Sequence, residues 1–270
     1  MEMSVLHKKL MVTAVGVLPL LMSGQLSAQN SGVLEEVIVT AQKREQNILE
    51  IPFAVSVVGE DEIKARGALD IKDLQYSIPG LSISSNFPGQ DRVQIRGASS
   101  DVGIGSPTVG RYLDEVSVNS DATQRALDIP LLDIQRVEVL RGPQGTLYGA
   151  GSIGGTMRFI TNSPDLSETS GELGFGFNSV DGGGNGSEIS GVFNVPIVED
   201  ELAMRIVAST ENIAGWIDNT ATGESDVNEA DRTFVRTKFL YQPSETFNAS
   251  FLWMNYDFEQ DNNNHELSES

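Results

Sequence analysis

The chain has 270 residues, a formal net charge of −20 and no Cys. The missing Cys excludes a disulfide framework and thiolate metal sites. The acidic balance argues against nucleic acid as a partner, because phosphate binding needs clustered Lys and Arg. The two histidines, His7 and His265, stand far apart in the sequence, and no nucleophile–histidine–acid set can be assembled around them. We therefore expect no enzyme activity, no cofactor and no metal site.

The first residues carry the pattern of an export signal. Lys8 and Lys9 precede an apolar run over 10–22, and Leu26-Ser27-Ala28 resembles a cleavage site. This order is typical of a secretory signal peptide, and a buried core helix fits the cationic flank poorly. We therefore expect residues 1–28 to be removed on export. No second apolar stretch is long enough to cross a membrane as a helix, so any membrane insertion would be as a β-barrel.

Residues 29–49 form a polar arm with one apolar island, EVIVTA, at 36–41. The arm is rich in Glu, Gln, Lys and Asn, a composition that buries too little apolar surface to hold one conformation. We expect residues 29–48 to be mobile when no partner is bound. An ordinary first strand of the next domain is the alternative interpretation of the island.

Residues 50–164 mix short helical and strand patterns and predict a small mixed sheet with short helices. Residues 61–66 predict a helix with acidic residues in its first turn and Gly67 at its end. Asp70 predicts the N-cap of a second helix, which ends before Pro79. Apolar, β-branched or alternating runs predict strands at 53–58, 81–85, 92–97, 111–118, 135–142 and 156–162.

Residues 148–157, YGAGSIGGTM, contain the spacing Gly-x-Gly-x-x-Gly. A dinucleotide-binding loop needs a strand just before these glycines and a helix that begins at the third one. The residues after Gly154 predict a strand instead, followed by Pro164. We therefore interpret the glycines as residues of tight turns and close backbone contacts.

From about residue 165 the chain alternates apolar and polar residues in five segments: 173–177, 189–197, 202–209, 235–241 and 247–253. Strands of a membrane barrel are about 10 residues long and have this period, as does a soluble sandwich with one wet face. The connections favour the barrel, because short ones at 196–200 and 243–245 alternate with longer ones, as in outer-membrane barrels. The aromatic residues predicted to face lipid are Phe175, Phe177, Phe239, Tyr241, Phe251 and Trp253.

Several motifs, in the same order, resemble the TonB-dependent outer-membrane receptors. IQRVEVLRGPQGTLYGAGSIGGTMRFITNSP (134–164) is similar to the last part of their plug domain, and RVQIRGASS (92–100) with GRYLDEVSV (110–118) to its middle. LEEVIVTAQKR (34–44) resembles the TonB box and the arm after it. The resemblance implies an α+β plug domain at 50–164, followed at 165–270 by the first antiparallel strands of a transmembrane β-barrel.

Five strands cannot close a membrane barrel, since the smallest have about 8 and an open edge in lipid leaves backbone groups unpaired. We therefore interpret the chain as the N-terminal portion of a longer, truncated receptor. The resemblance places it in the outer membrane, with the plug and the TonB box facing the periplasm.

The resemblance also implies roles for particular residues. The TonB box would be Glu36, Val37, Ile38, Val39, Thr40 and Ala41, which would add as a strand to the inner-membrane partner TonB. Arg96 and Arg141 would pair with carboxylates of the barrel wall, although a solvated surface arginine is the alternative at both. The glycines expected in turns or close backbone contacts are Gly97, Gly142, Gly145, Gly149, Gly151, Gly154 and Gly155.

For the function, the resemblance implies active uptake of a scarce small-molecule ligand, most often an iron chelate such as an iron–siderophore complex. Vitamin B12, a glycan or another small organic solute stays open as the substrate. A soluble periplasmic binding module built from a plug-like domain is the alternative of a different class. Such a module would have to cover the aromatic face of the five alternating segments.

Overall fold

The computed structural model describes residues 38–40, 46–51, 53–85, 91–98, 107–119, 129–149 and 151–260. The expected signal peptide and three TonB-box residues, Glu36, Val37 and Ala41, lie outside the described residues. Among those that are described, no helix is long and apolar enough to cross a membrane.

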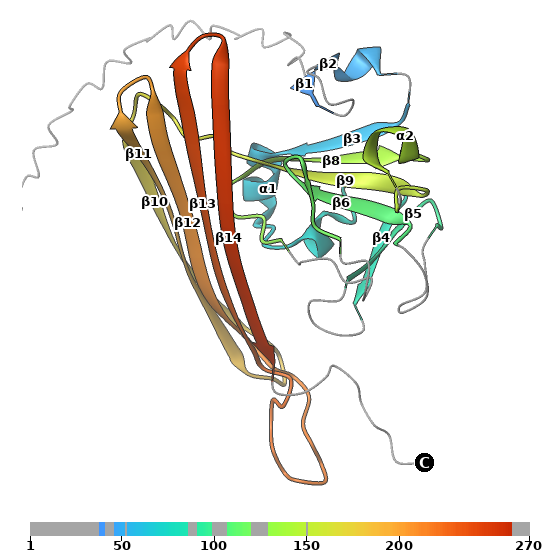
Figure 1. Ribbon diagram of the computed structural model, residues 1–270. Coiled ribbons are helices and arrows are strands. Elements are labelled where there is room, and N and C mark those ends of the chain that lie inside the picture. The colour runs from blue at the N-terminus through green and yellow to red at the C-terminus, as the bar shows by residue number, and fades with distance from the viewer. Residues whose placement is uncertain are drawn as a thin grey trace, which may run out of the picture. The chain divides into compact units, whose positions relative to one another are not determined.

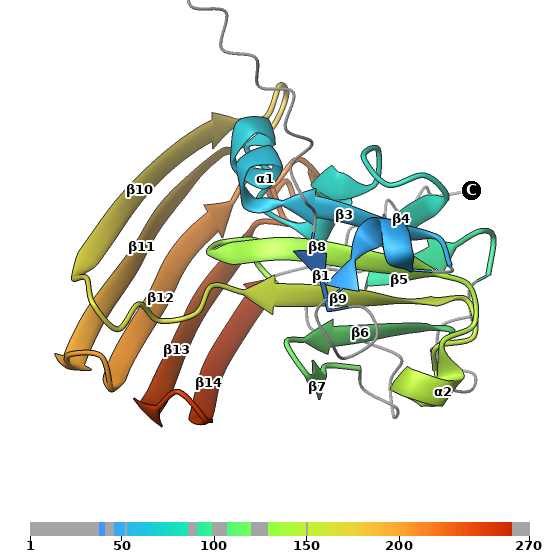
Figure 2. The same ribbon diagram turned by 90° about the horizontal axis from the view of Figure 1, so that it is seen from above.

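A five-stranded mixed sheet forms the centre of the plug, in the order β3-β8-β9-β6-β7 (Figure 2). Its strands are β3 (Val55–Gly59), β6 (Val109–Leu113), β7 (Val116–Ser117), β8 (Ile134–Arg141) and β9 (Gly155–Thr161). β6 runs parallel to β9, and the other neighbours are antiparallel. Strand β9 confirms that the glycine-rich stretch leads into a strand and not into a helix.

Smaller elements surround this sheet. β1 (Ile38–Val39) pairs with β2 (Gln46–Asn47), and β4 (Leu81–Ser85) pairs with β5 (Asp91–Ile95). The helical elements are η1 (Ile48–Glu50), α1 (Glu60–Arg66), η2 (Ile71–Leu74) and α2 (Gly145–Tyr148). Gly67 ends α1 in the left-handed conformation, and Asp70 caps η2 through its side chain. The predicted second helix therefore begins at its expected cap but is a short 3₁₀ element.

The core lies on one face of the sheet, where alternate residues of β8 meet the helical elements. Val137 and Val139 are fully buried there, whereas Glu138 and Leu140 point to the opposite face. The cluster includes Ile71, Leu74, Ile78, Ile95, Ile129, Leu131, Ile134, Met157 and Phe159. A period of two places apolar side chains on the core face and leaves the other face free for different contacts.

One prediction of a single strand was wrong. The run 111–118 folds as two strands, β6 and β7, because the chain turns at Asp114 with a φ of 50°. Asp is among the few residues that adopt a positive φ readily. The turn places Asp114 and Glu115 at the end of the sheet.

The C-terminal region forms a second five-stranded sheet, in the order β10-β11-β12-β13-β14, with every neighbour antiparallel (Figure 1). Its strands are β10 (Ser170–Ser179), β11 (Asn185–Val198), β12 (Leu202–Ile213), β13 (Ala230–Ser244) and β14 (Phe247–Gln260). Five strands were predicted, and all five form. The aromatic residues Phe175, Phe177, Tyr241, Phe251 and Trp253 are exposed.

Strand β14 carries apolar side chains on both faces, which its predicted alternation did not include. Phe251 and Trp253 are exposed, while Leu252 and Met254 pack against the core of the plug. The polar inner face expected of a barrel strand is therefore interrupted where the plug covers it.

The seven glycines singled out in the sequence differ in their surroundings. Positive φ angles occur at Gly97, Gly142, Gly149, Gly151 and Gly155. At Gly155 a Cβ would also collide with the carbonyl oxygen of Leu140 on the neighbouring strand. Gly154 is tightly packed, since a Cβ there would lie 3.0 Å from the Cβ of Ala98. Gly145 corrects the expectation: it begins α2 with an ordinary φ and has open space where a Cβ would be.

Candidate functional site

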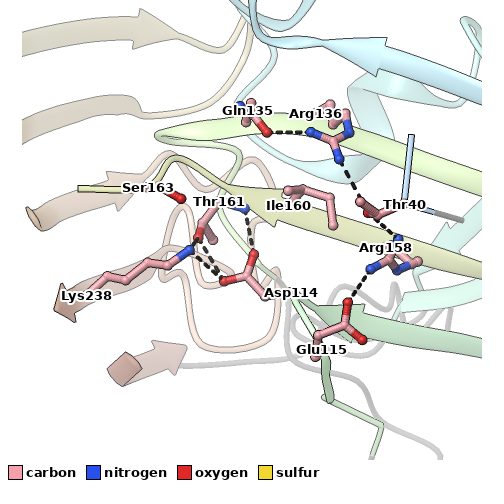
Figure 3. Close-up of a pocket in the computed structure, with 10 residues that line it drawn as sticks. All are labelled: Thr40, Asp114, Glu115, Gln135, Arg136, Arg158, Ile160, Thr161, Ser163 and Lys238. Carbon is pink, nitrogen blue, oxygen red and sulfur yellow. Dashed lines mark hydrogen bonds and ion pairs between the residues drawn. The ribbon is translucent and has the colours of Figure 1, made fainter. Parts of the chain in front are cut away.

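A buried ion pair lies at the middle of strands β8 and β9. Glu138 and Arg158 are direct cross-strand partners, and the Arg158 Nη1 donates to Glu138 Oε2 at 2.8 Å. Both side chains are almost completely buried. Arg136 adds a bond from its Nε to Glu138 Oε1 at 2.8 Å, and Arg158 Nη2 donates to Glu115 Oε1 at 2.7 Å (Figure 3). Two buried charges need this many partners, because desolvation costs several kcal/mol per ion.

Thr40 of the expected TonB box closes this ion-pair group. Its amide donates to Glu138 Oε1 at 3.0 Å. Its hydroxyl accepts from Arg158 Nη1 at 2.7 Å and from Arg136 Nη2 at 3.3 Å (Figure 3). We call Thr40, Arg136, Glu138 and Arg158 the Thr40 cluster.

Apolar contacts hold the segment beside the Thr40 cluster. Val39 is fully buried and packs with Ile51, Leu140 and Tyr148, and β1 pairs with β2. The described residues 38–40 and 46–48 therefore fold against the plug, as in the alternative interpretation of the island, and the mobility of residues 29–48 stays a prediction. The segment is placed there because Val39 has apolar cover and Thr40 has charged hydrogen-bond partners on the plug.

Tyr148 borders the same cluster. The guanidinium carbon of Arg158 lies 5.8 Å from the centre of its ring, within the range of a cation–π contact. Burial raises the pKa of Tyr148 to about 12, with the nearby carboxylates of Glu138 and Glu115 adding to the effect and Arg158 opposing it. The phenol of Tyr148 is therefore neutral at physiological pH and forms no ion pair with Arg158. The positive charge of Arg158 is balanced by the carboxylates of Glu138 and Glu115.

A second ionic group joins the plug to the long sheet. Arg205 on β12 donates to both oxygens of Asp133, at 2.9 and 2.7 Å. Arg236 on β13 reaches the same carboxylate at 3.3 Å and the backbone carbonyl of Asp133 at 2.9 Å. Asp133 adopts a φ of 57° just before β8, which turns its side chain and its carbonyl toward these two arginines. We call these three residues the Asp133 contact.

The surroundings of Asp133 favour its charged form. Burial by itself raises the pKa of this carboxyl, but hydrogen bonds from Arg205 and Asn162 and the charges of Arg236 and Arg205 outweigh burial. The net result is a pKa below the ordinary value of 3.8. The side chain is therefore an anion at neutral pH, where it attracts the two arginines.

A third polar contact lies beside the Thr40 cluster. Lys238 on β13 donates to Asp114 Oδ2 at 3.1 Å and to Thr161 Oγ1 at 2.8 Å (Figure 3). A cavity of about 480 Å³ separates this contact from Thr40. Its lining residues are Thr40, Asp114, Glu115, Gln135, Arg136, Arg158, Ile160, Thr161, Ser163 and Lys238. Charged groups of both signs line it and are largely paired with one another, so the cavity has no single sign that would select a free ion.

Arg96 and Arg141, the two arginines singled out in the sequence, lie elsewhere. Arg96 is exposed with a φ of 53°, and Arg141 donates to the carbonyl of Pro79 at 3.3 Å. Neither forms an ion pair within the part of the chain that the structure describes. Their expected pairing with the barrel wall stays a prediction.

Sequence reasoning missed the residues that do join the two sheets. Asp133, Arg205 and Arg236 stand among many charged residues, and nothing in their spacing connects them. The available signal was the polar inner face of the barrel strands: Arg205, Arg236 and Lys238 all fall on it. Cations on that face, in a chain of net charge −20, indicate acidic partners on the domain that fills the barrel.

The fold and these contacts define a class of protein, in which a plug domain is bound through ion pairs to the first strands of a β-barrel. Residues 47–156 match the TonB-dependent Receptor Plug Domain family. The chain belongs to the TonB-dependent receptors, which are proteins of the outer membrane, and carries their plug and five antiparallel barrel strands.

Two relatives show which members of the family this chain is similar to. The pesticin receptor of Yersinia enterocolitica is 31% identical over 230 residues, which are 84% of this chain and 32% of that receptor. The vitamin B12 transporter BtuB of Photobacterium profundum is 34% identical over 157 residues, 55% of this chain and 24% of the transporter. These relatives are receptors and transporters, not enzymes. The chain spans about a third of the length of the pesticin receptor.

A solved structure agrees with this comparison. The crystal structure of the ferric yersiniabactin uptake receptor FyuA from Yersinia pestis superposes with a TM-score of 0.61 at 29% sequence identity. The match covers 72% of this chain and 29% of FyuA. The plug and the long strands therefore fold as they do in a known receptor of this family.

Proposed function

We propose that the chain is part of a receptor that takes up a ferric siderophore across the outer membrane, with energy supplied by TonB. The observation that carries the proposal is the position of Thr40. A residue of the expected TonB box is bonded to Glu138 on β8 and to Arg158 on β9, the central strands of the plug. A partner that pulls on the box therefore applies force directly to the middle of the plug sheet.

The substrate class is supported by relatives. A pesticin receptor and a ferric yersiniabactin uptake receptor both match this chain over most of its length. Vitamin B12 is the second candidate, because a vitamin B12 transporter is 34% identical over 157 residues. A soluble binding module is disfavoured by Phe175, Phe177, Phe251 and Trp253, which would expose aromatic rings to water along the sheet.

The substrate is tested by an uptake assay in a reporter bacterium that lacks its own ferric-siderophore and cobalamin receptors. This bacterium carries the gene together with its natural flanking DNA. We expect import of at least one ⁵⁵Fe-labelled siderophore in a strain with TonB and none in a strain without it. Import of labelled cyanocobalamin and of no ferric chelate would favour the second candidate. Import that is unchanged by the loss of TonB would refute the proposed energy source.

The role of the TonB box in energy coupling is tested by a substitution that changes its backbone. We propose that the described residues 38–40 leave the plug and that the box at 36–41 adds as a strand to a sheet edge of TonB. In such an interaction main-chain hydrogen bonds give most of the affinity. Ile38→Pro removes one donor and fixes φ, so it should abolish uptake, whereas Ile38→Ala, the matched control, should be milder. Binding of the solute at the outer face should survive both substitutions. Energised uptake by Ile38→Pro at the normal rate would mean that this segment is not the coupling site.

A further inference from the structure

We infer that Asp133 is a positioning residue, which keeps strands β8 and β9 attached to the barrel wall at β12 and β13 while the rest of the plug rearranges. The inference rests on the proposed uptake function. Its consequence is that the solute passes on the side of the plug away from β12 and β13.

The first support is the burial and multiplicity of the Asp133 contact. The carboxylate is bonded by Arg205 through two nitrogens and by Arg236 through one. The side chains of Asp133 and Arg236 are 3% and 2% exposed. Paired Arg–carboxylate bonds of this kind are short, directional and about twice as strong as neutral ones. Separating them would leave buried charges without partners, which is the costly way to break a buried pair.

Two further contacts lie on the same side of the plug. Lys238 bonds to Asp114 and to Thr161 at the end of β9, and Leu252 and Met254 of β14 pack against the core cluster of the plug. Polar and apolar contacts thus coincide along one wall. The plug would have to break both kinds together to leave that wall.

The path from the TonB box to this wall is short and runs through hydrogen-bonded strands. Asp133 directly precedes β8, which carries Glu138, and Thr161 ends β9, which carries Arg158. A load applied at Thr40 therefore reaches β8 and β9, whose ends are fixed to β12 and β13. The antiparallel pairing of β8 with β9 resists separation of the two, so displacement is directed to the parts of the plug that lack these attachments.

The chain has no native Cys, so introduced thiols can be joined selectively. The test uses the receptor carrying Asp114→Cys and Lys238→Cys, treated in whole cells with a short bismaleimide that bridges the two thiols. The control is the same double variant alkylated with a monofunctional maleimide, which differs from it only in the covalent bridge. We expect the bridged receptor to import labelled solute at no less than half the rate of the control. A lower rate would overturn the inference, since this side would then have to open.

A second measurement concerns Asp133 itself. Asp133→Asn should lower the maximal uptake rate by at least tenfold and leave the dissociation constant for solute at the outer face unchanged, and Asp133→Glu should restore most of the rate. A residue with a merely structural role would lower rate and binding together through loss of folded receptor. Normal uptake by Asp133→Asn, or a parallel loss of binding, would contradict the inference. Absence of any import by the unmodified receptor would instead refute the proposed function.

Discussion

Removal of the Thr40 hydroxyl should release the TonB box from the plug. Thr40→Val keeps the shape of the side chain and deletes the oxygen that accepts from Arg158 at 2.7 Å and from Arg136 at 3.3 Å. Hydrogen bonds to charged groups contribute about 1.5–3 kcal/mol each. Arg158 keeps Glu138 and Glu115 as partners, so the net loss of stabilisation should be about 2 kcal/mol.

This loss translates into a measurable opening of the segment. Since 1.4 kcal/mol is a factor of ten, ~2 kcal/mol raises the population of the released segment about 30-fold. Hydrogen exchange of residues 38–40, followed by mass spectrometry on the receptor purified in detergent, should accelerate by that factor, because the Thr40 amide is bonded to Glu138 only while the segment is in place.

The matched control is Thr40→Ser, which keeps the hydroxyl and should exchange at nearly the wild-type rate. The reasoning is refuted if Thr40→Val exchanges as slowly as the wild type. It is equally refuted if Thr40→Ser accelerates as much as Thr40→Val, since the methyl group and not the hydroxyl would then secure the segment.

Three further predictions concern stability and assembly. Because the pKa of Asp133 is lowered, the contribution of this residue to stability is complete above the ordinary value of 3.8 and is lost as the pH falls through the lowered pKa. Acid unfolding of Asp133→Asn, followed by intrinsic fluorescence, should therefore depend less on pH below about 4 than acid unfolding of the wild type. Gly155→Ala should lower the denaturant midpoint of the purified receptor by the equivalent of several kcal/mol, whereas Gly145→Ala should leave it unchanged or raise it by up to about 1 kcal/mol, and equal effects of the two would contradict the backbone argument. Phe251→Arg, on the exposed aromatic face, should cost up to about 2–4 kcal/mol near the middle of the bilayer and reduce the heat-modifiable folded band in outer-membrane fractions, while Ser250→Arg on the other face should assemble normally.

Local structure was predictable wherever neighbouring residues decide it. Gly67 ends α1 and Asp70 caps η2 because left-handed backbone and side-chain capping depend on the residue itself. The five long strands follow from alternation in the same way. The hairpin at Asp114 was missed because residues with strand preference lie on both sides of the turn, and the strand is broken by the positive φ of Asp114.

The contacts between distant parts of the chain were not predictable. Thr40 and Glu138 are 98 residues apart, and Asp133 and Arg205 are 72 apart. No period or spacing connects such pairs, since each depends on how two separately formed sheets meet. The same reason explains Leu252 and Met254: their apolar side chains on the inner face make sense only once the plug covers them.

The Asp133 contact also specifies the register of two barrel strands. Arg205 pairs across the sheet with Lys238, and Val207 pairs with Arg236, so both arginines stand on one face, close to a single carboxylate. A slip of β13 against β12 by one residue would turn every side chain of β13 to the opposite face and carry Arg236 to the lipid side. Of the alignments that differ by one residue, only the observed one brings both arginines to Asp133.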